Sequence, residues 1–132
     1  MRIIIAGSRD FNDVEMLNKE VLKVLNILYL ESNNKLRRKD IEMISGTANG
    51  ADKLGESFAK HYNIKLTLFP ADWNKYGKSA GYKRNKQMSL YAKENNGVLI
   101  AFWNGTSKGT KLMIDIAKED ALQVFVIKTD TK

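Results

Sequence analysis

The 132-residue sequence contains no cysteine, which excludes disulfide bridges, thiolate metal sites and a cysteine nucleophile. Its single histidine, His61, follows Lys60 late in a predicted helix, a position typical of a surface side chain. A Ser-His-Asp triad and a histidine-based zinc site are therefore disfavoured, and we expect neither a metal nor a cofactor. Any chemistry would depend on carboxylates, arginine and lysine side chains, hydroxyls and backbone amides.

Long apolar runs are absent as well. No stretch approaches the ~20 residues of a membrane span, and Met1 and Arg2 lead directly into a strand-like segment without a signal-peptide pattern. We therefore expect a cytoplasmic protein with no membrane partner. A length of 132 residues with 43% hydrophobic residues is typical of one domain with one core, which we assign to residues 1–132.

Acidic residues are outnumbered by basic ones. The 15 Asp and Glu residues and the 22 Lys and Arg residues give a net charge of +7. This excess favours an anionic partner, either a small phosphate compound or nucleic acid. The alternative is that lysine-rich helices keep the protein soluble. One compact basic cluster, residues 35–39, lies outside the motifs described below, in a predicted connection.

Apolar strand-like segments alternate with helical patterns along the chain. Strands are predicted over 2–6, 41–45, 64–69, 97–103 and 123–128. A helix is predicted over 51–62, and a glycine-containing loop over 71–81 leads to another helix that ends at about residue 94. A further helix is predicted around 111–121, and one face of a long helix between the first two strands is marked by Val14, Leu17, Val21, Leu25 and Leu28. This alternation without hairpin signals predicts an α/β fold, a three-layer Rossmann-like sandwich with a five-stranded parallel sheet. We expect the first and fourth strands to lie side by side at its centre.

Three loops after predicted strands combine glycine with hydroxyl or amide side chains: GSRDFN (7–12), SGTANGAD (45–52) and NGTSKGT (104–110). In open α/β sheets, ligands bind beyond the carboxyl ends of the strands, where the strand order reverses. Glycine lets the backbone approach a ligand, and a following helix N-terminus offers free N–H groups to a phosphate. No loop contains GK[ST] or GxGxxG, so a standard P-loop NTPase or NAD dehydrogenase is disfavoured. Each loop alone is also compatible with a simple tight connection.

The residues predicted to bind the ligand come from these loops and from the helix before the fourth strand. They are Gly7, Ser8, Arg9, Ser45, Gly46, Thr47, Arg84, Asn85, Gly105, Thr106, Gly109 and Thr110. The alternative for Arg9 is an ion pair with Asp10 or Asp13. Asp13 and Thr110 are candidate helix N-caps, and Asp52 is interpreted first as a charge at a helix start.

Five motifs in order, GSRDF, SGTANGAD, PADW, AGYKRNKQM and GTSKGT, resemble the YspA-like branch of the SLOG superfamily from Gly7 to about Met113. The resemblance implies a Rossmann-like domain that binds nucleotides or nucleotide-derived ligands at these loops. Relatives in the superfamily include the LONELY GUY phosphoribohydrolases, the DNA-processing protein A, and sensor domains for nucleotide signals in bacterial defence systems.

The sequence departs from the phosphoribohydrolase motif PGGxGTxxE, whose glutamate acts at the ribose. Gly109 and Thr110 match the GT pair, but Met113 stands at the glutamate position. Because a thioether cannot act as a carboxylate does, this departure argues against that hydrolase chemistry. Arg84 and Met88 still resemble the family's arginine helix motif, which is compatible with phosphate binding.

The sequence therefore predicts a domain that binds a nucleotide or nucleotide-derived ligand and acts as a sensor or sequestering domain. The first alternative is hydrolysis of an N-glycosidic or phosphoester bond, with Asp10, Asp52 or Asp115 as the catalytic carboxylate. The second alternative is binding of single-stranded nucleic acid, by analogy with the DNA-processing relative and from the positive net charge. A homo-oligomer is left open as a partner.

Overall fold

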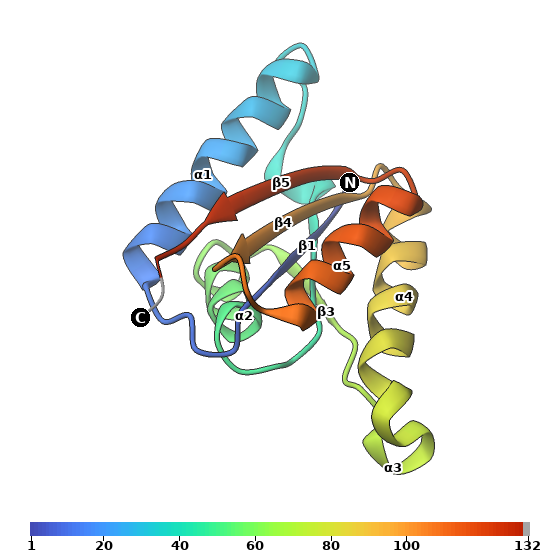
Figure 1. Cartoon of the computed structure of the whole chain (residues 1–132). Helices are drawn as coiled ribbons and strands as arrows, with labels where there is room; N and C mark the ends of the chain where they lie inside the picture. Colours follow the sequence, from blue (N-terminus) through green and yellow to red (C-terminus); the bar gives the residue numbers. More distant parts are fainter. Residues whose placement is uncertain (131–132) are drawn as a thin grey trace.

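One five-stranded sheet forms the centre of the computed structural model, which describes residues 1–130 (Figure 1). Its strands are β1 (Arg2–Gly7), β2 (Glu42–Ser45), β3 (Lys65–Leu68), β4 (Val98–Trp103) and β5 (Gln123–Lys128). All neighbouring pairs are parallel, in the order β3-β2-β1-β4-β5. The predicted parallel sheet and the central pairing of the first and fourth strands are confirmed.

Two helices cover each face of the sheet. α1 (Val14–Glu31) and α2 (Ala51–His61) lie on one face, and α4 (Ala80–Lys93) and α5 (Lys108–Glu119) lie on the other. The alternating side chains of β1 divide between these layers, since Ile3 and Ile5 pack toward the first pair and Ile4 toward the second. The structure is therefore the three-layer sandwich that the sequence predicts.

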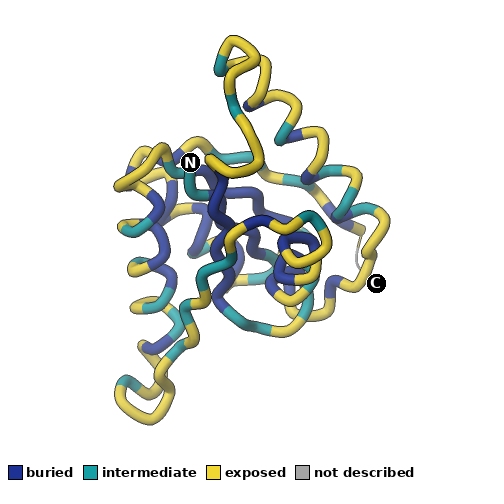
Figure 2. Tube along the Cα trace, turned by 180° about the vertical axis from the view of Figure 1, so that it is seen from behind, coloured by how far each residue is buried: buried dark blue, intermediate teal, exposed yellow. Residues whose placement is uncertain are grey.

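The central strands are apolar because both of their faces are covered. β1 and β4 lie in the buried interior in Figure 2, whereas the edge strands β3 and β5 carry several exposed side chains. This difference follows from position, because an edge strand has a neighbour on one side only. The exposed polar residues of β3 are compatible with that place at the edge of the sheet.

α1 begins where the sequence predicts a cap. The Asp13 carboxylate accepts a hydrogen bond from the Met16 amide at 3.0 Å, so Asp13 is confirmed as an N-cap. Leu17, Val21 and Leu28 are buried as expected. Val14, at the start of the predicted apolar face, is instead 51% exposed. Helical periodicity places Val14 on the apolar stripe, but the stripe extends past the part of the helix that the core covers.

The segment 71–81 contains more helix than its glycines indicate. Instead of one loop it forms α3 (Trp73–Tyr76) and a 3₁₀ turn (Gly77–Ser79) before α4. Asp72 starts α3 by accepting a hydrogen bond from the Lys75 amide at 3.0 Å. This side-chain cap stabilises a short helical turn. The turn has no apolar periodicity, so the sequence pattern does not predict it.

α5 begins at Lys108, three residues before the predicted start, and its N-cap is Ser107. The Ser107 hydroxyl accepts a hydrogen bond from the Thr110 amide at 3.3 Å. The prediction of Thr110 as a cap is therefore wrong, because Ser107 already occupies that role one turn earlier.

Within residues 1–130, no helix has both the length and the apolar character needed to cross a membrane. His61 lies exposed at the end of α2, as its position in the sequence predicts.

Candidate functional site

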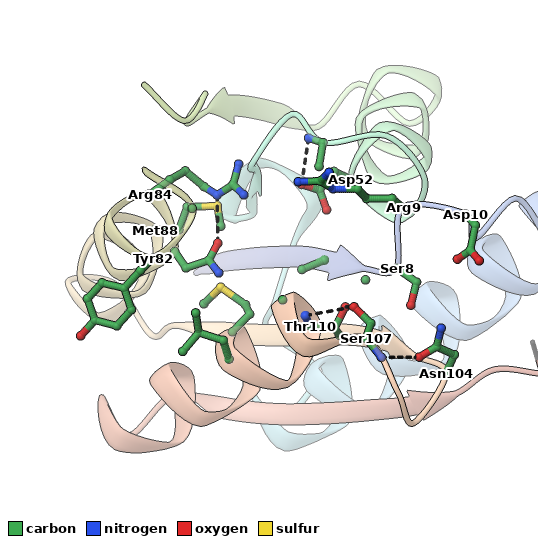
Figure 3. Close-up of a pocket in the computed structure, with 18 of the residues that line it drawn as sticks. Ser8, Arg9, Asp10, Asp52, Tyr82, Arg84, Met88, Asn104, Ser107 and Thr110 are labelled. Atoms are coloured by element: carbon green, nitrogen blue, oxygen red, sulfur yellow. Dashed lines mark hydrogen bonds between the residues drawn. The ribbon is translucent and has the colours of Figure 1, made fainter. Parts of the chain in front are cut away.

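A pocket of about 690 Å³ opens at the carboxyl ends of β1 and β4, where the strand order reverses (Figure 3). Its walls come from the loop after β1, the start of α2, α3, α4 and the start of α5. Segments far apart in the sequence meet here because parallel strands place all their carboxyl ends at the same edge. The volume is within the range typical of small-molecule sites.

Ser8 lies at the base of the pocket, directly after β1. It is only 3% exposed, and its hydroxyl has no hydrogen-bond partner among the residues that the structure describes. A buried hydroxyl without a partner costs about 1–3 kcal/mol, so a ligand atom that bonded to it would relieve a real penalty.

Two glycines allow the backbone around Ser8 to pack closely. A Cβ on Gly7 would lie 2.5 Å from the Phe102 carbonyl oxygen. Gly50 has a φ of +79°, and a Cβ there would lie 2.2 Å from the Ser8 carbonyl oxygen. That carbonyl accepts hydrogen bonds from the amides of Phe11 and Ala51, which join the loop after β1 to the start of α2.

The start of α5 forms a wall of the pocket beside Ser8 (Figure 3). Asn104 accepts hydrogen bonds from the amides of Thr106 and Ser107, both at 2.8 Å, which hold the loop in a tight turn. The amides of Lys108 and Gly109 have no hydrogen-bond partner within the described chain. A Cβ on Gly109 would meet no atom within 4 Å, so the first turn of α5 is open to the pocket. This wall is suited to an anion.

Arg84 extends from α4 to the loop after β2. Its guanidinium donates hydrogen bonds to the Gly46 carbonyl and, at 2.9 Å, to the Asn85 side-chain oxygen. Burial lowers the pKa of Arg84, and the nearby Asp52 carboxylate partly offsets that effect. Arg84 therefore brings a partly desolvated positive charge into the pocket and ties two of its walls together.

Asp52 lies in the first turn of α2, as expected, but it is also buried, with 5% exposure. Its carboxylate accepts a hydrogen bond from the Ala48 amide at 3.1 Å. Burial raises the pKa of Asp52 to about 6, while the Ala48 amide and Arg84 act in the opposite direction. The Asp52 carboxyl, which lines the pocket, therefore changes its charge at about pH 6.

Gly46 and Thr47 line a second pocket of about 510 Å³ instead of the first. Ser45 lines neither pocket. Its hydroxyl donates to the Glu56 carboxylate at 2.6 Å and accepts from the Thr47 amide at 3.0 Å, so it supports the shape of the loop.

The loop after β4 contributes different residues from those predicted. Gly105 and Thr106 are exposed and lie outside both pocket linings, whereas Asn104, Ser107, Gly109 and Thr110 line the first pocket. Sequence reasoning did not select Asn104 and Ser107. The sequence does contain a pattern that could have identified them. An asparagine, Asn104, that favours a turn is followed by Ser107 two residues before the GT pair, which is typical of a helix start.

The three candidate carboxylates have different surroundings. Asp52 is buried in the first pocket, and Asp10 is exposed at its rim. Asp115 is exposed on α5, outside the lining, and forms an ion pair with Lys111 at 2.8 Å. Arg9 also lines the pocket, and no ion pair joins it to Asp10 or Asp13 within residues 1–130.

Aromatic and apolar side chains complete the first pocket. Trp73, 51% exposed, lines both pockets, and Tyr82, Met88 and Met113 line the first. Tyr76 lines neither. Within the described residues, no group of three or more histidine or acidic side chains is placed to hold a metal ion.

Comparison with known proteins identifies the family of the chain. Residues 1–76 match the family model described as "YspA, cpYpsA-related SLOG family", which therefore covers more than half of the chain. The chain is also similar to the Gene 61 protein of Mycobacterium phage D29, with 31% identity over 88 residues, 63% of this chain and 68% of that protein. No solved structure matches the chain. Together with the predicted motifs and the parallel five-stranded sheet, the match shows that this chain belongs to the YspA, cpYpsA-related SLOG family.

Proposed function

We propose that this protein binds a nucleotide or nucleotide-derived ligand in the first pocket, as a sensor or sequestering domain. The observation that carries the proposal is the unpartnered hydroxyl of Ser8 in a pocket that is also lined by Gly109, whose amide has no partner within the described chain. These groups offer hydrogen-bond donors at the positive end of α5, where a phosphate is stabilised. Membership of a SLOG family favours the same ligand class.

The other walls of the pocket suit the remainder of a nucleotide. Leu112 offers apolar surface beside the buried Met88 and Met113, and Tyr82 offers an aromatic ring close by. Such surfaces receive nucleobases through stacking and apolar contact. Met113 is buried at the position of the phosphoribohydrolase glutamate, which supports binding without turnover by that route.

The test is a thermal-shift and calorimetric screen against nucleoside mono-, di- and triphosphates and cyclic nucleotides. A ligand at a hundred times its Kd stabilises the fold by about 2.7 kcal/mol. Gly109→Leu places a side chain into the open space at the start of α5, so we expect at least a tenfold loss of affinity. Lys118→Leu, in the last turn of the same helix, is the matched control and keeps wild-type affinity.

Gly46→Leu is a poor test of ligand binding, although Gly46 lies in the SGTANGAD motif. A Cβ there would lie 2.9 Å from both Arg84 and Asp52, so the variant would displace two pocket residues at once. If no nucleotide shifts the unfolding of the wild-type protein, or if Gly109→Leu binds as the wild type does, the proposal is wrong.

Hydrolysis of a nucleotide is the second candidate function, and the raised pKa of Asp52 is the observation that favours it. A buried carboxyl that titrates near neutral pH is suited to general acid–base work. Release of base or phosphate from nucleoside monophosphates would be followed for the wild type and for Asp52→Asn and Asp10→Asn. Asp115→Asn is the control, because Asp115 lies outside the pocket lining. Absence of turnover over the whole panel would exclude this candidate.

A further inference from the structure

The second pocket adjoins the first on the side of the loop after β2. Arg9, Ala48, Trp73 and Arg84 line both pockets, so the two spaces meet at these side chains. A ligand whose phosphate lies at the start of α5 beside Ser8 therefore has a continuous path past the next residue, Arg9, into the second pocket.

The boundary between the pockets is positively charged. Arg9 is exposed and forms no ion pair within the described residues, so its guanidinium is available to a ligand. Arg84 uses part of its five-donor guanidinium on Gly46 and Asn85 and is held in place by these bonds. Two arginines where the pockets meet are suited to bind a phosphate at that position.

The second pocket differs chemically from the first. Its walls include the hydroxyl of Thr47, the amide of Asn49 and the indole of Trp73, without the Met and Leu side chains of the first pocket. Thr47 also has a φ of +66°, a conformation that costs a β-branched residue free energy and that occurs often at ligand sites. These walls suit a group rich in hydroxyls better than a second nucleobase.

We propose that the ligand has two lobes: a nucleoside diphosphate in the first pocket, esterified to a hydroxyl-rich group, such as a sugar, in the second. This inference rests on the proposed function and specifies its ligand. One phosphate lies at the start of α5 beside Ser8, and the other lies between Arg9 and Arg84. The esterified group then lies against Thr47, Asn49 and Trp73.

The experiment compares matched pairs by calorimetry: ADP with ADP-ribose, UDP with UDP-glucose and GDP with GDP-mannose. For the base that binds, we expect the esterified ligand to bind at least about tenfold more tightly than the free diphosphate. Ala71→Trp fills the second pocket only, and we expect it to abolish this difference and leave diphosphate affinity within about twofold. Pro70→Trp is a second variant at the same pocket, and Asn74→Trp, which lines neither pocket, is the control.

The outcomes separate the two proposals. If a free diphosphate binds but no esterified partner binds more tightly, the two-lobed ligand is wrong and the proposed function stands. If Ala71→Trp and Pro70→Trp both leave the preference intact, the second pocket does not hold the esterified group and the inference is overturned. If neither member of any pair binds, both proposals fail together.

Discussion

At the scale of single residues, Asp52 is the group whose charge most depends on its surroundings. Its carboxylate is buried, accepts one hydrogen bond from the Ala48 amide, and lies near Arg84. Burial outweighs both favourable contacts and raises its pKa to about 6. The folded protein therefore binds a proton at Asp52 more tightly than the unfolded chain does between about pH 4 and pH 6.

We predict that Asp52→Asn becomes more stabilising, relative to the wild type, as the pH rises through this window. The carboxyl is neutral in both states below about pH 4, and above about pH 6 the wild type carries a buried charge. A shift from 3.8 to about 6 corresponds to about 3 kcal/mol of unfolding free energy. Urea unfolding of both proteins from pH 4 to pH 7.5 measures the change. A difference that stays constant over this range would refute the explanation by burial of charge.

At the scale of secondary-structure elements, glycine has opposite roles in α2 and α5. A Cβ on Gly55 of α2 would lie 2.9 Å from the Cβ and Cγ2 atoms of Ile5, so this glycine lets the helix approach β1. A Cβ on Gly109 of α5 would meet no atom within 4 Å. The same residue type therefore serves close packing in one helix and an open ligand wall in the other.

We predict opposite effects of alanine at these two glycines. Gly55→Ala overpacks the contact with Ile5 and lowers the free energy of unfolding by about 1–3 kcal/mol. Gly109→Ala gains helix propensity in open space and raises it by up to about 1 kcal/mol. Chemical denaturation of the two variants checks the signs. Equal effects at both positions would contradict the close contact between α2 and β1.

The caps of α1 and α5 allow a second comparison at this scale. Asp13→Ala and Ser107→Ala each remove a side chain that accepts a hydrogen bond from the first turn, so each costs about 1 kcal/mol of stability. Only Ser107 lines the first pocket, and its hydroxyl also lies 3.0 Å from that of Thr110. We therefore expect Ser107→Ala alone to weaken nucleotide binding, measured by calorimetry at matched folded fractions. Equal losses of affinity in both variants would mean that stability, not the pocket, determines binding.

At the scale of the whole molecule, the sheet separates the two basic regions. Residues 35–39 precede the first residue of β2, so they lie near the amino ends of the strands (Figure 1). The pockets open at the opposite, carboxyl ends. Arg9 and Arg84 are at the pocket end. The basic cluster therefore does not extend the pocket into one continuous groove.

This separation predicts different behaviour for nucleic acid and for nucleotides. We expect short single-stranded oligonucleotides to bind only at low ionic strength, because scattered phosphate contacts are lost as counterions compete. Replacing Lys35, Arg37, Arg38 and Lys39 together with glutamine reduces that binding and leaves nucleotide affinity unchanged. Fluorescence anisotropy at several salt concentrations measures both. Oligonucleotide binding that survives physiological salt and is lost in Gly109→Leu would instead identify the pocket as a nucleic-acid site.

Much of the fold and part of the site can be predicted from local patterns. Local sequence patterns predict the apolar runs of β1 and β4, the apolar face of α1 from Leu17 to Leu28 and the cap at Asp13, and the structure confirms these features. The sequence pattern does not predict α3, because this short helix is stabilised by a side-chain cap at Asp72 and has no apolar periodicity. The unpartnered state of Ser8 also escapes, since a missing partner becomes visible only when every neighbour has been placed.

The sequence by itself determined the class of the fold, because burial on both sheet faces requires continuous apolar strands and each helix requires its own apolar stripe and cap. It also determined which loops end the strands and carry glycine. Only the tertiary structure decided how these loops divide, with the loop after β4 in one pocket, Gly46 and Thr47 in another, and two arginines at their junction. Only the tertiary structure decided that Asp52 is buried enough for its pKa to rise to about 6. Both outcomes depend on distances between segments remote in the chain, and local sequence patterns do not encode such distances.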